Sequence, residues 1–147
     1  MAEEEKKPFI PYDKTHHLKK LLLVMTIVGQ GQGKFVLDLN NENEAAIAFS
    51  CSGKGTAPSA LYSVFGVGEL KKDVVLSVMR EEKWPAYRAG IEARFAVSKL
   101  AKGLSLAIPI DSVAGVSIYK MLTNTRTIEK PIEVKKPKKK AKREEKQ

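Results

Sequence analysis

The sequence contains a single cysteine, Cys51, which excludes an internal disulfide and with it the small secreted proteins that depend on such bonds. It also lacks a long hydrophobic run. The longest, residues 21–28, has eight residues, whereas a helix that crosses a bilayer needs about 20. Residues 1–7 are acidic and then basic with no apolar region behind them, unlike a secretory signal. We therefore expect a cytoplasmic protein that does not insert into a membrane.

Catalytic and metal-binding patterns are equally scarce. The chain has two histidines, His16 and His17, and adjacent histidines without a cysteine or carboxylate cluster beside them match no metal-ligand spacing. The sequence contains no Ser/His/Asp order and no paired carboxylates that would suggest a catalytic site. It therefore predicts no catalytic residue, no metal site and a protein that is not an enzyme.

What is present is the composition of a soluble globular protein, with an uneven charge. Of the 147 residues, 43% are hydrophobic and 29% are charged, which suits one core of ordinary size. The net charge is +9, and residues 129–147 hold nine Lys or Arg against four Glu, which gives +5 of it. We predict a flexible N-terminal arm at 1–17, one folded domain at 18–122 and a basic disordered tail at 123–147.

Six segments of the folded domain show strand or helix patterns. Dense runs of Leu, Val and Ile predict strands, and apolar residues three or four apart predict helices. In chain order they are a strand at 18–28, a helix at 34–42, strands at 45–52 and 73–79, a helix at 84–97 and a strand at 104–110. We also expect a short fifth strand at 116–122. The βαββαβ order predicts a ferredoxin-like α+β fold, in which an antiparallel sheet carries two helices on one face.

The apolar pattern indicates two buried surfaces. One is the core beneath the two helices, to which their apolar stripes belong: Phe35, Val36 and Leu39 in the first, and Trp84, Tyr87, Ile91 and Phe95 in the second. The strands are apolar on both sides, so the sheet face away from the helices should also be covered. We expect other subunits to cover it.

Two glycine-rich segments follow predicted strands. Residues 29–33 resemble the dinucleotide-binding fingerprint, but their order is G-x-G-x-G rather than G-x-G-x-x-G, and no strand ending in an acidic residue follows at the required distance. A tight strand-to-helix turn fits them better. In the second segment, Gly53, Lys54 and Gly55 could cradle a phosphate with backbone N–H groups and one cation, or could only build the turn that leaves a strand.

Three segments together resemble the PII nitrogen-regulatory family, and a divergent PII-like branch of it most closely. They are Gly-Lys-Gly-Thr at 53–56, Gly-Val-Gly-Glu-Leu-Lys-Lys-Asp-Val-Val-Leu-Ser at 66–77, and Lys-Gly-Leu-Ser-Leu-Ala-Ile-Pro-Ile-Asp-Ser-Val-Ala-Gly at 102–115. The resemblance covers about residues 18–118. It implies a ferredoxin-like homotrimer with its sheets facing inward, a flexible loop after the second strand that engages partners, and an adenine nucleotide in each cleft between subunits.

The resemblance also implies the residues of an effector site. By position, residues 52–56 correspond to the base of the partner loop, and residues 101–103 to the small loop on the phosphate side. The implied effector and phosphate site contains Gly53, Lys54, Gly55, Thr56, Lys102 and Gly103. The sequence departs from the family's pattern at Leu104, where a lysine is usual, and at Gly115 and Ser117, where two phosphate-clasping arginines are usual. The absence of both arginines weakens the case for ATP in particular.

The function implied is that of a PII-like signal-transduction protein. It would bind an adenylate-type effector (ATP, ADP, AMP or cyclic AMP) and regulate a target enzyme or transporter through residues 55–72, with no permanently bound cofactor. The alternative is a nucleic-acid-binding protein that acts through the Lys- and Arg-rich run at 135–143. That run contains no aromatic residue for stacking on bases, so a solvated tail explains it equally well.

Overall fold

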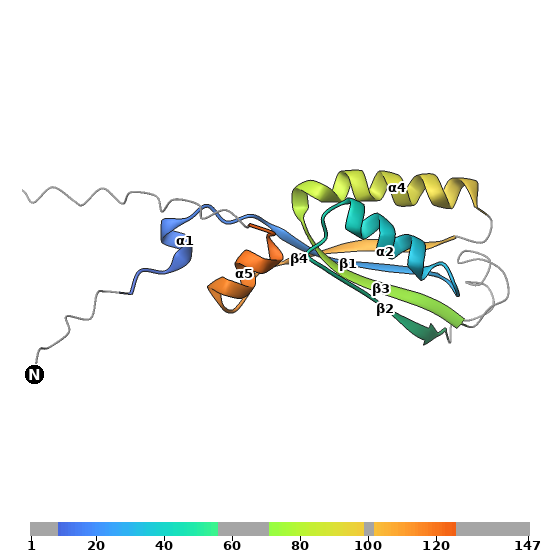
Figure 1. Ribbon diagram of the computed structural model, residues 1–147, viewed down its shortest axis with the longest axis horizontal. Coiled ribbons are helices and arrows are strands. Elements are labelled where there is room, and N and C mark those ends of the chain that lie inside the picture. Colours follow the sequence, from blue (N-terminus) through green and yellow to red (C-terminus); the bar gives the residue numbers. More distant parts are fainter. Residues whose placement is uncertain (1–8, 56–70, 99–101, 126–147) are drawn as a thin grey trace, which may run out of the picture. The chain divides into compact units, whose positions relative to one another are not determined.

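The computed structural model describes residues 9–55, 71–98 and 102–125 (Figure 1). The chain divides into two units, Met1–Leu18 with Ile128–Gln147 and Lys19–Thr127. The predicted domain boundaries at 17/18 and 122/123 stay predictions. Residues 56–70, which form most of the predicted partner loop and include Thr56, lie outside the described residues.

In the first unit, Tyr12–Thr15 forms α1, a single helical turn that the sequence analysis did not predict. The rings of Tyr12 and His16 stack with their centroids 3.9 Å apart. The segment predicted as a flexible arm therefore contains one ordered turn, and its flexibility stays a prediction.

The second unit contains the predicted domain. Its elements follow in the order β1 (Leu21–Gly29), α2 (Gly33–Glu42), β2 (Ile47–Lys54), β3 (Lys71–Arg80), a 3-10 turn (Glu81–Lys83), α4 (Trp84–Val97), β4 (Gly103–Ile110) and α5 (Val116–Leu122). The six segments predicted from periodicity are confirmed, with boundaries that differ by at most three residues. The long strands have this accuracy because their apolar runs end at glycines or charged residues.

The four strands form one antiparallel sheet in the order β2-β3-β1-β4. Helices α2 and α4 lie on the same face of this sheet (Figure 1). The arrangement confirms the predicted ferredoxin-like α+β fold. Pro109 is the next-to-last residue of the edge strand β4, where a missing N–H is tolerated, as its position in the sequence predicted.

Alternate residues of β1 and β3 face the helices and form the core. Val24 and Val28 of β1 are 1% exposed, as is Val75 of β3. They form one cluster with Met79 and with the buried helix residues Val36, Leu39, Tyr87 and Ile91, against which Phe35, Trp84 and Phe95 pack. Each fully buried apolar side chain contributes about 1.5–3 kcal/mol. The predicted stripes of both helices are therefore confirmed as core.

A hydrogen-bonded polar group is enclosed in this core. Thr26 Oγ1 lies 2.7 Å from the Tyr87 hydroxyl oxygen and 2.8 Å from Ser105 Oγ, so the group joins β1, α4 and β4. Burial raises the pKa of the Tyr87 hydroxyl, against the lowering effect of hydrogen bonds from Thr26, Ser105 and Asn40. The neutral hydroxyl is thus favoured, and its bonds fix the position of α4 over the sheet.

Residues 116–122 form α5 rather than the predicted fifth strand, so that prediction was wrong. Val116 and Ile118 favour strands by propensity, but propensity yields to tertiary contacts. Gly115, with φ +94°, turns the chain into the helix. The Tyr119 hydroxyl then accepts a hydrogen bond from the Lys19 N–H and donates one to the Lys19 carbonyl, 3.1 Å away. These bonds hold α5 beside the start of β1. As a helix, the segment forms its backbone hydrogen bonds internally and needs no neighbouring strand.

The sheet face opposite α2 and α4 is apolar on all four strands. Directly opposed residues of antiparallel strands share a face, so the register assigns its members. Its apolar members are Ile47, Phe49 and Cys51 of β2; Val74, Leu76 and Val78 of β3; Leu23, Met25 and Ile27 of β1; and Leu104, Leu106 and Ile108 of β4, and the same register places Lys72 and Arg80 at its two ends. We call this set the open face. Phe49 is 53% exposed and Ile108 44% exposed in the single chain, and burial of the open face by other subunits stays a prediction.

Candidate functional site

The predicted effector residues that the structure describes lie at one end of the sheet. Gly53 of β2 pairs with Lys72 of β3, and Lys72 pairs with Gly29 of β1. On the next strand, Gly103 pairs with Val28. Lys54 and Lys102 flank these pairs along β2 and before β4, and Gly55 follows β2 directly. The sheet thus aligns the two predicted loops at the end where β2 leaves toward residues 56–70.

The same pairs also separate the two halves of the site. Strand β2 forms one edge of the sheet and β4 the other, with β3 and β1 between them. Three strand spacings amount to about 14 Å between Gly53 and Gly103. Within one chain, Lys54 and Lys102 are therefore on opposite edges of the sheet, and a single phosphate cannot contact both the Gly53 and the Gly103 amide.

Two further cations belong to this end, at positions that the sequence pattern had assigned to the connecting loop. Lys71 and Lys72 begin β3, and Lys71 lies directly opposite Lys54 in the register. Like charges at directly opposed positions destabilise a strand pair, so an anion between them would be favourable. The signal that could have identified them is the Lys-Lys pair where the connecting segment ends and the next strand begins, because that point lies opposite the Gly-Lys-Gly segment at the end of the preceding strand.

The first glycine-rich segment, residues 29–33, is a tight turn between β1 and α2, as the sequence analysis favoured. Gly31 has φ +84°, a conformation that glycine adopts without strain. Asp73 Oδ2 accepts hydrogen bonds from the N–H groups of Gly31 at 2.8 Å and Gly33 at 3.0 Å. The donors that a dinucleotide phosphate would need are therefore bonded to a side chain of β3. No sequence pattern indicated Asp73, because Gly33 of the turn is 40 residues away along the chain.

The glycines of the predicted effector site differ in what the fold requires of them. A Cβ added at Gly103 would lie 2.1 Å from the carbonyl oxygen of Ile27, so close pairing with β1 demands a glycine there. A Cβ added at Gly53 would lie 3.6 Å from Val74 Cγ2, an ordinary contact. Packing therefore explains Gly103 and does not explain Gly53.

The positions at which the sequence departs from the PII pattern supply no cation. Leu104 is 37% exposed and belongs to the open face. Gly115 precedes the first residue of α5, and Ser117 is exposed in its first turn. Any phosphate held at the predicted site must therefore use the lysines and the backbone amides.

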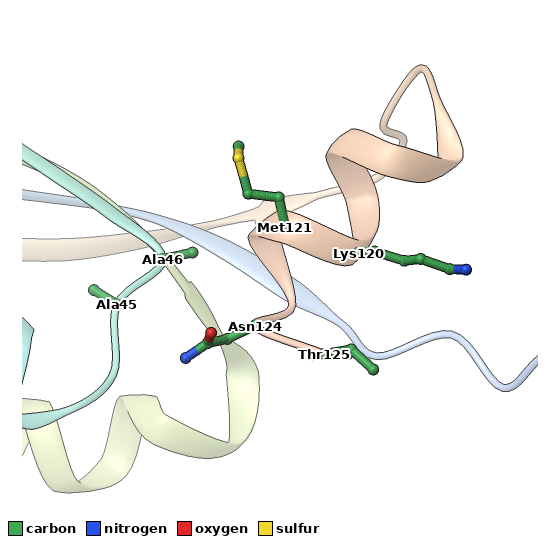
Figure 2. Close-up of a pocket in the computed structure, with 6 residues that line it drawn as sticks. All are labelled: Ala45, Ala46, Lys120, Met121, Asn124 and Thr125. Carbon is green, nitrogen blue, oxygen red and sulfur yellow. The ribbon is translucent and has the colours of Figure 1, made fainter. Parts of the chain in front are cut away.

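A cavity of about 430 Å³ lies at the other end of the sheet (Figure 2). It is lined by Ala45, Ala46, Lys120, Met121, Asn124 and Thr125. The Asn124 side chain points toward Ala45, whereas the Lys120 side chain extends away from both alanines (Figure 2). Next to Ala45, Glu44 makes ion pairs with Lys83 at 3.1 Å and with Arg80, and a hydrogen bond from Lys83 lowers the pKa of the Glu44 carboxyl. The cavity contains none of the predicted effector residues.

Residues 9–55, 71–98 and 102–125 contain neither a membrane-spanning helix nor a cluster of metal ligands. In these ranges no helix combines the length and the apolar character that a bilayer crossing requires. Within the same part of the chain, no three His, Cys, Asp or Glu side chains converge as metal ligands would.

Comparison with known proteins supports the fold. No family model matches the chain, and no curated protein matches it. Among solved structures, it is similar to CPII from Thiomonas intermedia K12, a nitrogen regulatory PII-like protein, in its complex with ADP, AMP and acetate. That match has 15% identity, a TM-score of 0.51, and covers 71% of this chain and 97% of CPII.

Two CutA proteins are similar to the same degree. CutA1 from Oryza sativa matches with 16% identity and a TM-score of 0.52 over 73% of this chain and 93% of its own. CutA from Synechococcus elongatus PCC7942, complexed with Bis-Tris, matches with 11% identity and a TM-score of 0.52 over 74% and 95%. At these identities the likeness establishes the fold, and the resemblance to PII-like proteins is confirmed at that level.

Proposed function

We propose that this chain is a PII-like signal-transduction protein: a cytoplasmic homotrimer that binds an adenine nucleotide at the clefts between copies and regulates a target protein through residues 55–72. One observation carries the proposal. The two halves of the predicted effector site lie at the same end of the sheet but on its opposite edges.

Opposite edges meet when copies associate head to tail. A closed ring formed by such contacts brings the β2 edge of one copy to the β4 edge of the next. Lys54 and Lys71 of one copy would then face Lys102 and the Gly103 amide of its neighbour. Backbone N–H groups and ammonium groups are the donors that phosphate oxygens accept. Assembly thus supplies the proximity that the single chain lacks.

The open face gives the driving force for such a ring. Twelve apolar or sulfur-containing side chains from four strands form it, and Ile47, Phe49, Leu104 and Ile108 are each more than a third exposed in the single chain. Soluble monomers rarely expose a continuous apolar patch of this kind. Three copies that turn their open faces inward would bury it.

The ligand class follows from the donors available. CPII is described in complex with ADP and AMP, which makes these nucleotides the first candidates here. With Gly115 and Ser117 at the positions of the usual arginines, the site has fewer bidentate donors for a third phosphate. We therefore expect ADP or AMP to bind more tightly than ATP. Binding would regulate the target by contacts made in only one conformation of the loop.

Isothermal titration calorimetry with ADP, AMP, ATP and cyclic AMP tests this, combined with sedimentation of the same sample. We expect a trimer with one nucleotide per cleft, and about tenfold weaker binding in Lys54→Ala and in Lys102→Ala. Lys20→Ala is the matched control, because it removes the same charge at the other end of β1 and loses only an exposed ion pair to Glu81. A monomer in dilute buffer, or no heat with any of the four nucleotides, would refute the proposal.

A further inference from the structure

The turn between β1 and α2 has the form that binds phosphate in other proteins. A glycine-rich segment leads from a strand into the N-terminus of a ten-residue helix, whose first N–H groups have no partner within the helix. The first turn of α2 contains no acidic residue and contains Lys34. The N-terminal end of a helix carries a partial positive charge, and Lys34 adds a full one, so this end of α2 favours an anion.

The anion is supplied by the chain itself. Asp73 Oδ2 accepts from both the Gly31 and the Gly33 N–H groups, at 2.8 and 3.0 Å. The contact is close: a Cβ added at Gly33 would lie 3.1 Å from Asp73 Oδ2 and 2.8 Å from Ser50 Oγ. A carboxylate that is hydrogen-bonded to two amides at this separation occupies the place of a phosphate.

Asp73 also lies beside the cationic pair. Along β3 it follows Lys71 by two residues, which places both side chains on one face of the sheet about 6.6 Å apart. Across the strand pair, Ser52 lies opposite Asp73 and Lys54 lies opposite Lys71. The carboxylate that bonds the glycine turn therefore lies on the same sheet face as Lys71 and Lys54.

We infer that Asp73 is a positioning residue that closes the β1–α2 turn to anions from solution, so that an anionic effector is confined to the Lys54 and Lys71 side of the sheet end. The confinement to the lysines rests on the proposed function. The closing of the turn does not, because it depends only on the Asp73 hydrogen bonds.

The test is an NMR titration of the full chain with inorganic pyrophosphate, following the backbone amides of Gly31, Gly33, Lys54 and Lys71. In the unmodified protein we expect the Lys54 and Lys71 amides to shift saturably while those of Gly31 and Gly33 do not move. In Asp73→Ala the Gly31 and Gly33 amides should shift saturably as well, and their hydrogen exchange should accelerate about tenfold or more. Ser52→Ala, which truncates the polar side chain directly across the strand pair to the same methyl group, should behave like the unmodified protein.

Asp73→Asn separates hydrogen bonding from charge and serves if Asp73→Ala does not fold. The asparagine oxygen can still accept from the two amides, so the turn should stay closed to pyrophosphate while exchange at Gly31 and Gly33 accelerates less than in Asp73→Ala. The inference is overturned if Gly31 and Gly33 respond to pyrophosphate in the unmodified protein. It is also overturned if their exchange is the same in both Asp73 variants as in the unmodified protein. A chain that binds no nucleotide but passes these tests loses only the proposed function.

Discussion

Gly103 approaches Ile27 so closely that a Cβ at position 103 would lie 2.1 Å from the Ile27 carbonyl oxygen. The contact occurs at the first residue of β4, where Gly103 pairs with Val28 across the strand. Real Cβ atoms essentially never come this close to a backbone oxygen, so any side chain at position 103 must displace one of the two strands. Because Lys102 directly precedes Gly103, the same contact also fixes the position of the Lys102 backbone at this end of the sheet.

Gly103→Ala should therefore destabilise the fold, by about 2–4 kcal/mol, through displacement of the start of β4. Gly53→Ala is the matched control at the other edge, because the added methyl group meets only Val74 Cγ2 at 3.6 Å. We expect its free energy of unfolding to stay within about 1 kcal/mol of the unmodified protein. Denaturant unfolding of both variants measures the difference, and equal stabilities would contradict the packing account of Gly103.

The buried hydroxyl of Tyr87 should make a measurable contribution to stability. Tyr87→Phe removes its hydrogen bond to Thr26 and leaves the Thr26 bond to Ser105 in place, at a cost of about 1 kcal/mol. Thr26→Val should cost more, because it leaves the buried Tyr87 hydroxyl and the half-buried Ser105 hydroxyl without that partner. In the double variant the two costs should not add, since each single change breaks the same hydrogen bond, the one between Thr26 and Tyr87. Additive costs in denaturant unfolding would show that the network is not coupled.

The same hydroxyl predicts a pH dependence. Burial raises the Tyr87 pKa above its ordinary value of about 10, so the folded state holds the proton more tightly than the unfolded state. This contribution to stability is complete below pH 10 or so and is lost as the pH rises further. Above about pH 10 the free energy of unfolding should fall more steeply with pH in the unmodified protein than in Tyr87→Phe. Parallel pH profiles would mean that the hydroxyl is not desolvated.

The spacing of apolar residues predicted most of this fold, because packing a layer of helices on a sheet requires an apolar side chain at every core-facing position. Tyr87 and Ile91 lie one turn apart on α4 and both face the core, so spacing alone identified them. Spacing could not show that the Tyr87 hydroxyl meets Thr26, which is 61 residues away along the chain. Residues 116–122 defeated the prediction for a similar reason: α5 is held by the bonds between Tyr119 and Lys19, 100 residues apart.

The candidate site was predictable in its parts and not in its arrangement. Gly53, Lys54 and Gly103 were identified from short segments of sequence, but which strands are edges depends on the whole sheet order. Lys71 was overlooked because its pairing with Lys54 depends on the register of β2 with β3. The separation of the two halves of the predicted site, on which the proposal of a second copy rests, is visible only once the four strands are placed.

If other copies bury the open face, as proposed, a charge there should disrupt assembly without unfolding the chain. Phe49 is 53% exposed on the open face of the edge strand β2. Phe49→Asp should leave a folded protein by circular dichroism that sediments as a smaller species, because a desolvated carboxylate at an interface is strongly unfavourable. Ala93→Asp, at an exposed position of α4, should sediment as the unmodified protein does. If both variants stay assembled, the open face is not the contact surface.

A mixing experiment separates a site shared between copies from one within a single chain. Lys54→Ala and Lys102→Ala each remove one side of every proposed cleft, so neither variant alone should bind nucleotide at the affinity of the unmodified protein. When the two are unfolded and refolded together in equal amounts, each cleft takes its β2 edge from one copy and its β4 edge from another. About a quarter of the clefts in a randomly mixed ring then contain both lysines.

We therefore expect calorimetry to recover tight ADP sites in about a quarter of the clefts of the mixture and in none of the separate variants. A double variant, Lys54→Ala with Lys102→Ala, mixed with either single variant gives the control, because no cleft in that mixture can contain both lysines. A tagged copy of one variant, used to recover the other, shows that mixed assemblies have formed. If mixed assemblies form and no tight sites return, the two lysines do not act on one ligand, and the cleft between copies is not the effector site.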